Sequence, residues 1–148
     1  MNQQPPAELR EALRAVSADM HQALQELTLA LETELHAIHV LDSAALDSAG
    51  AHKQALLSRL EELDVERRQL LRAAPDAHAV RDPAWPQIEQ TLRSCQELNQ
   101  RNGKLVNRHL GQVREALSIL TGSDGEGRLY DHAGSVHPKP RSHILAEA

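Results

Sequence analysis

The residues with the most obvious capacity for chemistry are nine histidines. The best metal-ligating pattern combines Glu32, His36 and His39, whose spacing places the three side chains near one face of a helix. A di-metal site in a helical bundle needs Glu-x-x-His motifs repeated on facing helices, and the sequence holds no second copy. We therefore interpret the histidines as residues of helix surfaces and expect neither a metal nor another cofactor.

Cys95, the single cysteine, is the candidate nucleophile. A catalytic thiol needs a neighbouring base and an oxyanion site, whereas the place of Cys95 on an apolar stripe favours a small core residue. The sequence also lacks a His-Glu-x-x-His motif and a phosphate-cradling glycine loop. One unpaired cysteine is typical of a reducing compartment. We expect a protein that is not an enzyme.

The composition excludes several classes of protein. The chain has 148 residues, no Phe, one Trp (Trp85) and one Tyr (Tyr130), whereas β-sheet proteins need many aromatic and β-branched residues. A net charge of −5 gives no basic field for nucleic acid. The sequence has no apolar run of membrane-spanning length, and residues 1–6 do not resemble a secretion signal. A cytoplasmic all-α protein is the expectation.

Three apolar stripes at helical spacing predict three long helices, which we place at about residues 7–41, 43–72 and 84–121. Asp42 or Ser43 is suited to cap the second helix, and Asp82 before Pro83 to cap the third. The first two helices could instead form one helix kinked at Gly50. We favour a hairpin, because a single rod would leave its stripe without an intramolecular partner.

Helices of matched length with short connections pack antiparallel. We therefore predict an all-α fold, an elongated antiparallel helical hairpin plus a third long helix, in a coiled-coil-like bundle over residues 1–121. Residues 122–148 are rich in Gly and Pro and hold few apolar residues, which predicts a flexible C-terminal tail. A packed C-terminal arm is the alternative for this segment.

Charge is distributed unevenly along the chain. Residues 1–73 hold twelve acidic and seven basic residues, whereas residues 84–121 hold three acidic and five basic ones. The third helix is thus mildly basic beside an acidic hairpin. Either the acids of the hairpin neutralise it within the bundle, or it meets an acidic segment of a partner.

The most unusual segment of the third helix contains Asn99, Asn102 and Gly103. Both asparagines lie on or beside the apolar stripe, where they need hydrogen-bond partners, and a glycine inside a helix costs about 1 kcal/mol relative to alanine. The asparagines could fix the register of the bundle while Gly103 permits a close approach of helices. The segment could also be a helix break, or a face that receives another chain.

Several motifs together resemble the FlgN family of flagellar type III export chaperones, over roughly residues 20–136. The hairpin carries Leu41-Asp42-x-x-Ala45-Leu46 and a leucine repeat from Lys53 to Leu63. The third helix carries Leu98-Asn99-x-x-Asn102-Gly103 and Val113-x-x-Ala116-Leu117-x-Ile119-Leu120. A glycine-rich segment follows with Leu129-Tyr130-Asp131-x-x-Gly134.

This resemblance implies a cytoplasmic chaperone that binds the C-terminal helices of hook–filament junction proteins of the FlgK and FlgL types. It also implies delivery to the FlhA-type component of the export gate, with Tyr130 as the docking residue. The expected client-binding face of the third helix comprises Asn99, Asn102, Gly103, Val106, Leu110, Val113, Leu117 and Leu120. The alternatives are a homo-oligomeric coiled-coil adaptor without an export role and a metal-binding bundle. A concentration-dependent mass above that of the monomer, persisting with client present, would favour the adaptor. A weak homodimer is also among the expected partners.

Overall fold

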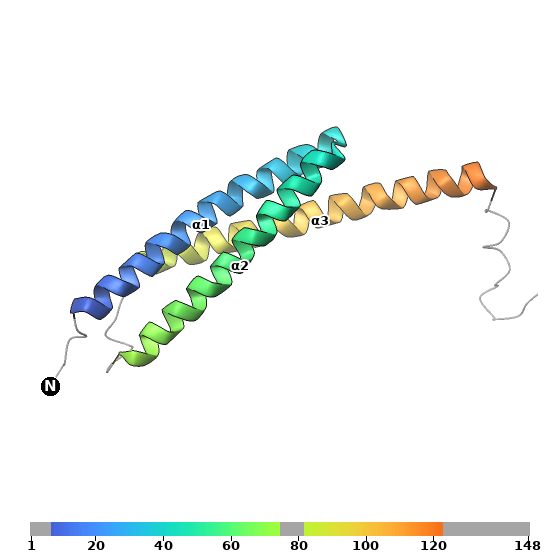
Figure 1. The fold of residues 1–148 in the computed structure, drawn as a ribbon. Coiled ribbons are helices and arrows are strands. Elements are labelled where there is room, and N and C mark those ends of the chain that lie inside the picture. Colours follow the sequence, from blue (N-terminus) through green and yellow to red (C-terminus); the bar gives the residue numbers. More distant parts are fainter. Residues whose placement is uncertain (1–6, 75–81, 123–148) are drawn as a thin grey trace, which may run out of the picture. The chain divides into compact units, whose positions relative to one another are not determined.

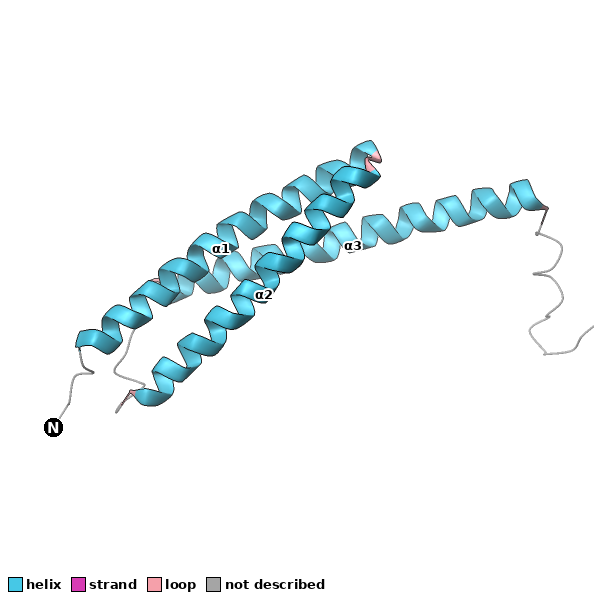
Figure 2. Ribbon diagram, viewed as in Figure 1, coloured by secondary structure: helices cyan, strands magenta, loops and turns pink. Residues whose placement is uncertain are grey.

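The computed structural model describes residues 7–74 and 82–122. They form α1 (Ala7–Val40), α2 (Ser43–Ala73) and α3 (Trp85–Thr121), and the described residues contain no strand (Figures 1 and 2). The prediction of an all-α fold with three long helices is confirmed. None of these helices combines the length and the apolar character needed to cross a membrane. The predicted tail and Tyr130 lie outside the described residues, apart from Gly122.

The chain divides into two compact units, one up to Val106 and one from Asn107 onward. This boundary falls inside α3, whereas the sequence analysis placed the end of the bundle after residue 121. The first unit holds α1, α2 and the first part of α3. The described residues of the second unit are the rest of α3 and Gly122.

In the first unit, α1 and α2 form the predicted hairpin rather than one kinked helix, and they lie side by side in Figure 1. Leu41 ends α1 in the left-handed conformation (φ 57°), and the amide of Asp42 donates to the carbonyl oxygen of Ala37 at 3.0 Å. These features define a Schellman-type helix end. The carboxylate of Asp42 then caps α2 by accepting from the amide of Ala45 at 3.0 Å.

The core of the first unit lies where all three helices meet. Leu24 and Leu31 from α1, Leu63 from α2 and Ile88 from α3 are almost completely buried. Cys95 joins this core, and its sulfur lies 3.3 Å from the hydroxyl oxygen of Thr28, a contact between α3 and α1. The prediction that Cys95 is a core residue is confirmed.

The start of α3 is tied to both helices of the hairpin. The Asp82 carboxylate accepts from the amide of Ala84 at 2.9 Å and also from the hydroxyl of the buried Ser17. On the α2 side, the guanidinium of Arg67 lies 3.6 Å from the ring centroid of Trp85, a cation–π contact. Arg67 occupies a position where the leucine stripe predicts an apolar residue, and this stacking explains it.

Candidate functional site

Four polar residues meet where α3 packs on the hairpin, and we call them the polar cluster: Glu34, Lys53, Asn99 and Asn102. The ammonium group of Lys53 donates to a carboxylate oxygen of Glu34 at 2.6 Å and to the amide oxygen of Asn99 at 3.1 Å. The amide nitrogen of Asn102 donates to the other Glu34 oxygen at 2.9 Å and to the carbonyl oxygen of Leu31 at 2.8 Å. The cluster therefore joins all three helices.

Burial makes the polar cluster specific. Asn102 is 1% exposed and Glu34 is 6% exposed, so their bonds form out of contact with water. Moving α3 along α1 would leave these groups buried without partners, which is costly. The contacts thus match the interpretation in which the asparagines fix the register of the bundle. In this structure a partner protein cannot reach the side chain of Asn102.

Gly103 serves neither of the two structural roles considered from the sequence. A Cβ atom added at Gly103 would meet nothing within 4 Å, so no neighbouring helix requires a glycine there. The helix also continues without interruption through this position, since α3 runs from Trp85 to Thr121. Gly103 is exposed and lies one residue after the buried Asn102.

The apolar spacing of α3 continues beyond the first unit. The part of α3 that belongs to the second unit, residues 107–121, has apolar residues at steps of three and four up to residue 120.

Together with Val106, these residues form what we call the α3 stripe: Val106, Leu110, Val113, Leu117 and Leu120. Val106 is half-buried, whereas Leu117 is 54% exposed and Leu120 is 82% exposed. Leu110 and Val113 are similarly exposed. Steps of four and three residues align the five side chains along one face, as in the seam of a coiled coil. A contiguous exposed apolar face of this kind is a candidate surface for binding another protein.

The ion pairs of the described residues bear on the two interpretations of charge. The bridges formed by Lys53, Arg59, Arg67 and Arg68 have their acidic partners in α1 and α2. Within residues 7–74 and 82–122, no ion pair links a basic residue of α3 to an acid of the hairpin. In the described residues, the acids of the hairpin therefore do not neutralise the basic residues of α3 through direct ion pairs.

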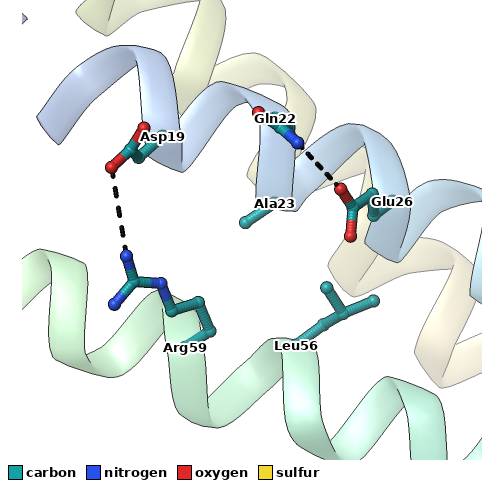
Figure 3. Close-up of a pocket in the computed structure, with 6 residues that line it drawn as sticks. All are labelled: Asp19, Gln22, Ala23, Glu26, Leu56 and Arg59. Atoms are coloured by element: carbon teal, nitrogen blue, oxygen red, sulfur yellow. Dashed lines mark hydrogen bonds and ion pairs between the residues drawn. The ribbon is translucent and has the colours of Figure 1, made fainter. Parts of the chain in front are cut away.

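The hairpin also has a small depression of about 250 Å³ between α1 and α2, shown in Figure 3. Asp19 and Arg59 form an ion pair at 3.9 Å on one side, and the amide nitrogen of Gln22 donates to Glu26 at 3.1 Å on another. Ala23 leaves the space because its side chain is short. The charged groups are exposed and already bonded to one another, so we do not interpret this depression as a ligand-binding site.

The histidine pattern of α1 faces water. Glu32, His36 and His39 are all exposed. Across the two described ranges, no three His, Cys, Asp or Glu residues are grouped so that they could hold a metal ion. Among the described residues, the α3 stripe is therefore the candidate functional surface.

Long α-helices, the last of which has an exposed apolar face, are typical of a helical protein that binds other proteins. The family comparison agrees with this class. The chain matches the family model described as FlgN protein over residues 1–138, and it belongs to the FlgN family. The resemblance inferred from the motifs is confirmed, and the general role is that of a chaperone in flagellum biogenesis. Neither the curated proteins nor the solved structures contain a match.

Proposed function

We propose that this protein binds the C-terminal helices of hook–filament junction proteins of the FlgK and FlgL types in the cytoplasm. Binding would keep these clients unassembled until the chaperone delivers them to the flagellar export gate. The observation that carries the proposal is the α3 stripe, whose apolar side chains are exposed from Leu110 to Leu120. A client helix that buries an apolar face in the assembled filament needs a substitute surface before assembly.

The dimensions of the α3 stripe suit a single client helix. From Val106 to Leu120 it extends about 21 Å, at ~1.5 Å per residue, or about four helical turns. Each half-exposed Leu or Val contributes on the order of 1 kcal/mol when a client covers it. Part of that gain offsets the loss of rotational and translational freedom on binding. The resulting affinity is modest, which suits a chaperone that must release its client.

The client site within the face expected from the sequence is centred on the α3 stripe. The amide oxygen of Asn99 and the amide nitrogen of Asn102 have their hydrogen-bond partners in the bundle. Asn102 is buried, whereas Asn99 and Gly103 are exposed. We therefore assign Asn99 and Gly103 to the edge of the client site, Asn102 to the contacts that hold α3, and the stripe residues to the centre of the client site. On this assignment the polar cluster holds α3 in place while the stripe makes the contacts.

The proposal is tested with the full chain and the C-terminal segment of a FlgK- or FlgL-type client, by co-purification after co-expression and by calorimetry. Leu117→Asp places a charge in the middle of the stripe and should raise the Kd by more than about 30-fold, the scale of an interface hot spot. Leu110→Asp should act in the same direction. Helicity measured by circular dichroism should be unchanged, because both side chains are exposed.

Leu29→Asp is the matched control, because Leu29 is an exposed leucine on α1 outside the stripe. It should leave the Kd within about twofold of the unmodified protein. Equal losses from Leu29→Asp and Leu117→Asp would place the client elsewhere. A self-associated form whose mass persists with client present would instead support the homo-oligomeric adaptor.

Docking at the export gate is assigned to Tyr130 on the family resemblance alone, since Tyr130 lies outside the described residues. Tyr130→Ala should leave the affinity for the client segment unchanged while weakening capture by the cytoplasmic domain of the FlhA-type component. Pull-down of both partners with the same preparation separates the two activities. A variant that loses only client binding would contradict this role.

A further inference from the structure

The residues that flank the α3 stripe carry a chemical preference of their own. In a coiled coil, one flank of this seam consists of the residues that follow Val106, Val113 and Leu120, which are Asn107, Arg114 and Thr121. The other flank consists of the residues that precede Leu110 and Leu117, which are His109 and Ala116. The two flanks thus hold one arginine, one histidine and no carboxylate. Such flanking positions set partner choice in coiled coils through their charges.

The charges farther from the stripe sharpen this arrangement. Glu115 is the single acidic residue of segment 107–121, and it follows Arg114 by one helical step of about 100°. That step carries Glu115 to the face opposite the stripe, where Arg108 also lies. Among the described residues, neither Arg108 nor Arg114 forms an ion pair. Arg114 is therefore an exposed cation at the edge of the stripe, available to a partner.

A second copy of this chain is a poor occupant of the surface. Because the flanks contain no carboxylate, pairing two α3 stripes in any register offers Arg114 a neutral or cationic neighbour. In a parallel pair, that neighbour is His109 of the other copy. Like charges across a helical seam destabilise pairing by about as much as opposite charges stabilise it.

We propose that the α3 stripe selects a foreign amphipathic helix whose apolar face is flanked by carboxylates, with Arg114 as the residue that reads them. This inference rests on the proposed function, because it specifies the chemistry of the helix that the stripe binds. The apolar contacts supply most of the affinity, and the flank sets which helices are accepted.

The test uses two synthetic helical peptides of about 21 residues that differ only beside their leucine seam. One carries Glu at every flanking position and the other carries Lys, and calorimetry measures each against the full chain at low salt. The Glu peptide should bind about threefold to tenfold more tightly than the Lys peptide. Because exposed charges are screened, this preference should disappear at about 1 M salt.

Two charge reversals on α3 then locate the effect. Arg114→Glu should reverse the order of the two peptides, since it places a carboxylate on the flank. Arg108→Glu makes the same change of net charge on the far face and should keep the original order. The C-terminal segment of a natural client should likewise lose affinity with Arg114→Glu and not with Arg108→Glu.

The inference fails if the Lys peptide binds as tightly as the Glu peptide, or if both reversals act equally. It also fails if neither peptide binds while the natural client segment does. In these cases the proposed function stands as long as Leu117→Asp still raises the Kd for the client by more than about 30-fold. If Leu117→Asp has no effect on the client either, the proposed function and this inference are both wrong.

Discussion

The two parts of α3 have the same spacing of apolar residues, but these residues are buried in one part and exposed in the other. In residues 85–106, Ile88 and Cys95 are buried against the hairpin, whereas Val113 and Leu117 in residues 107–121 are exposed. The apolar face runs through both parts without a change of direction, because the steps between its residues remain three or four. The spacing alone therefore does not decide which of these residues are buried.

A simple hydrophobic rule would place apolar residues on the packed part of the α3 seam and polar residues on the exposed part, and the sequence does the opposite. The part of α3 that packs on the hairpin holds Asn99 and Asn102 on its seam, and the seam of the exposed part is wholly apolar from Val106 to Leu120. Buried polar contacts specify one register at some cost in stability. An exposed apolar seam without polar residues does not by itself select among apolar partners, so any selection must come from the residues beside the seam. The contacts that fix the register thus belong to the first part, and the second part has the uninterrupted apolar face on which the client site is proposed.

The largest expected difference between the two parts of α3 is in the free energy of unfolding when one asparagine in each part is changed to aspartate. Asn102→Asp replaces a buried donor by a carboxylate oxygen that faces Glu34 and the carbonyl oxygen of Leu31. An uncompensated buried charge costs about 3–5 kcal/mol, so the free energy of unfolding should fall by about that amount. Urea denaturation followed by circular dichroism measures it.

Asn107→Asp is the matched change in the second part, because Asn107 is exposed. It should alter the free energy of unfolding by less than about 0.5 kcal/mol. Similar losses for Asn102→Asp and Asn107→Asp would mean that the polar cluster does not hold α3 on the hairpin in solution. The comparison drawn between the two parts of α3 would then be wrong.

A smaller difference is expected when apolar side chains are shortened. Ile88 is completely buried, so Ile88→Ala should cost about 2–4 kcal/mol through lost burial and the cavity left behind. Val113→Ala should leave the free energy of unfolding within about 0.5 kcal/mol, because Val113 is exposed. In a client-binding assay the order should reverse, with Val113→Ala the more damaging of the two folded variants. A large stability loss from Val113→Ala would indicate that the stripe is already covered in the free protein.

The helices could be predicted from the sequence, but the contacts between them could not. Helices predicted at about residues 7–41, 43–72 and 84–121 are found at Ala7–Val40, Ser43–Ala73 and Trp85–Thr121, because periodicity and caps are local signals. The partners of Asn102 are not local. They come from α1, 68 and 71 residues earlier in the chain, and no pattern around Asn102 identifies them.

The roles of two charged residues in the leucine pattern of α2 could not be predicted for the same reason. Lys53 and Arg67 interrupt a leucine pattern, and the sequence alone gives no reason for either. Lys53 bonds to Glu34 and Asn99, and Arg67 stacks on Trp85, so each contact needs helices that are distant in sequence. The α3 stripe could be predicted as apolar for the same local reasons as the core. Its exposure could not, since the same apolar spacing is found in the buried and in the exposed part of α3.

The smallest effect concerns the glycines of α3, one in each part of the helix. A Cβ atom added at Gly103 or at Gly111 meets nothing within 4 Å, and both residues lie inside α3. Gly103→Ala and Gly111→Ala should therefore each raise the free energy of unfolding or local helix stability by about 0.5–1 kcal/mol, through the lower entropy of the unfolded chain. Amide hydrogen exchange along α3 measures this locally, and calorimetry with the client segment measures binding. If Gly103→Ala weakens client binding while Gly111→Ala does not, Gly103 contacts the client directly, and the client site extends from the stripe onto the part of α3 beside the polar cluster.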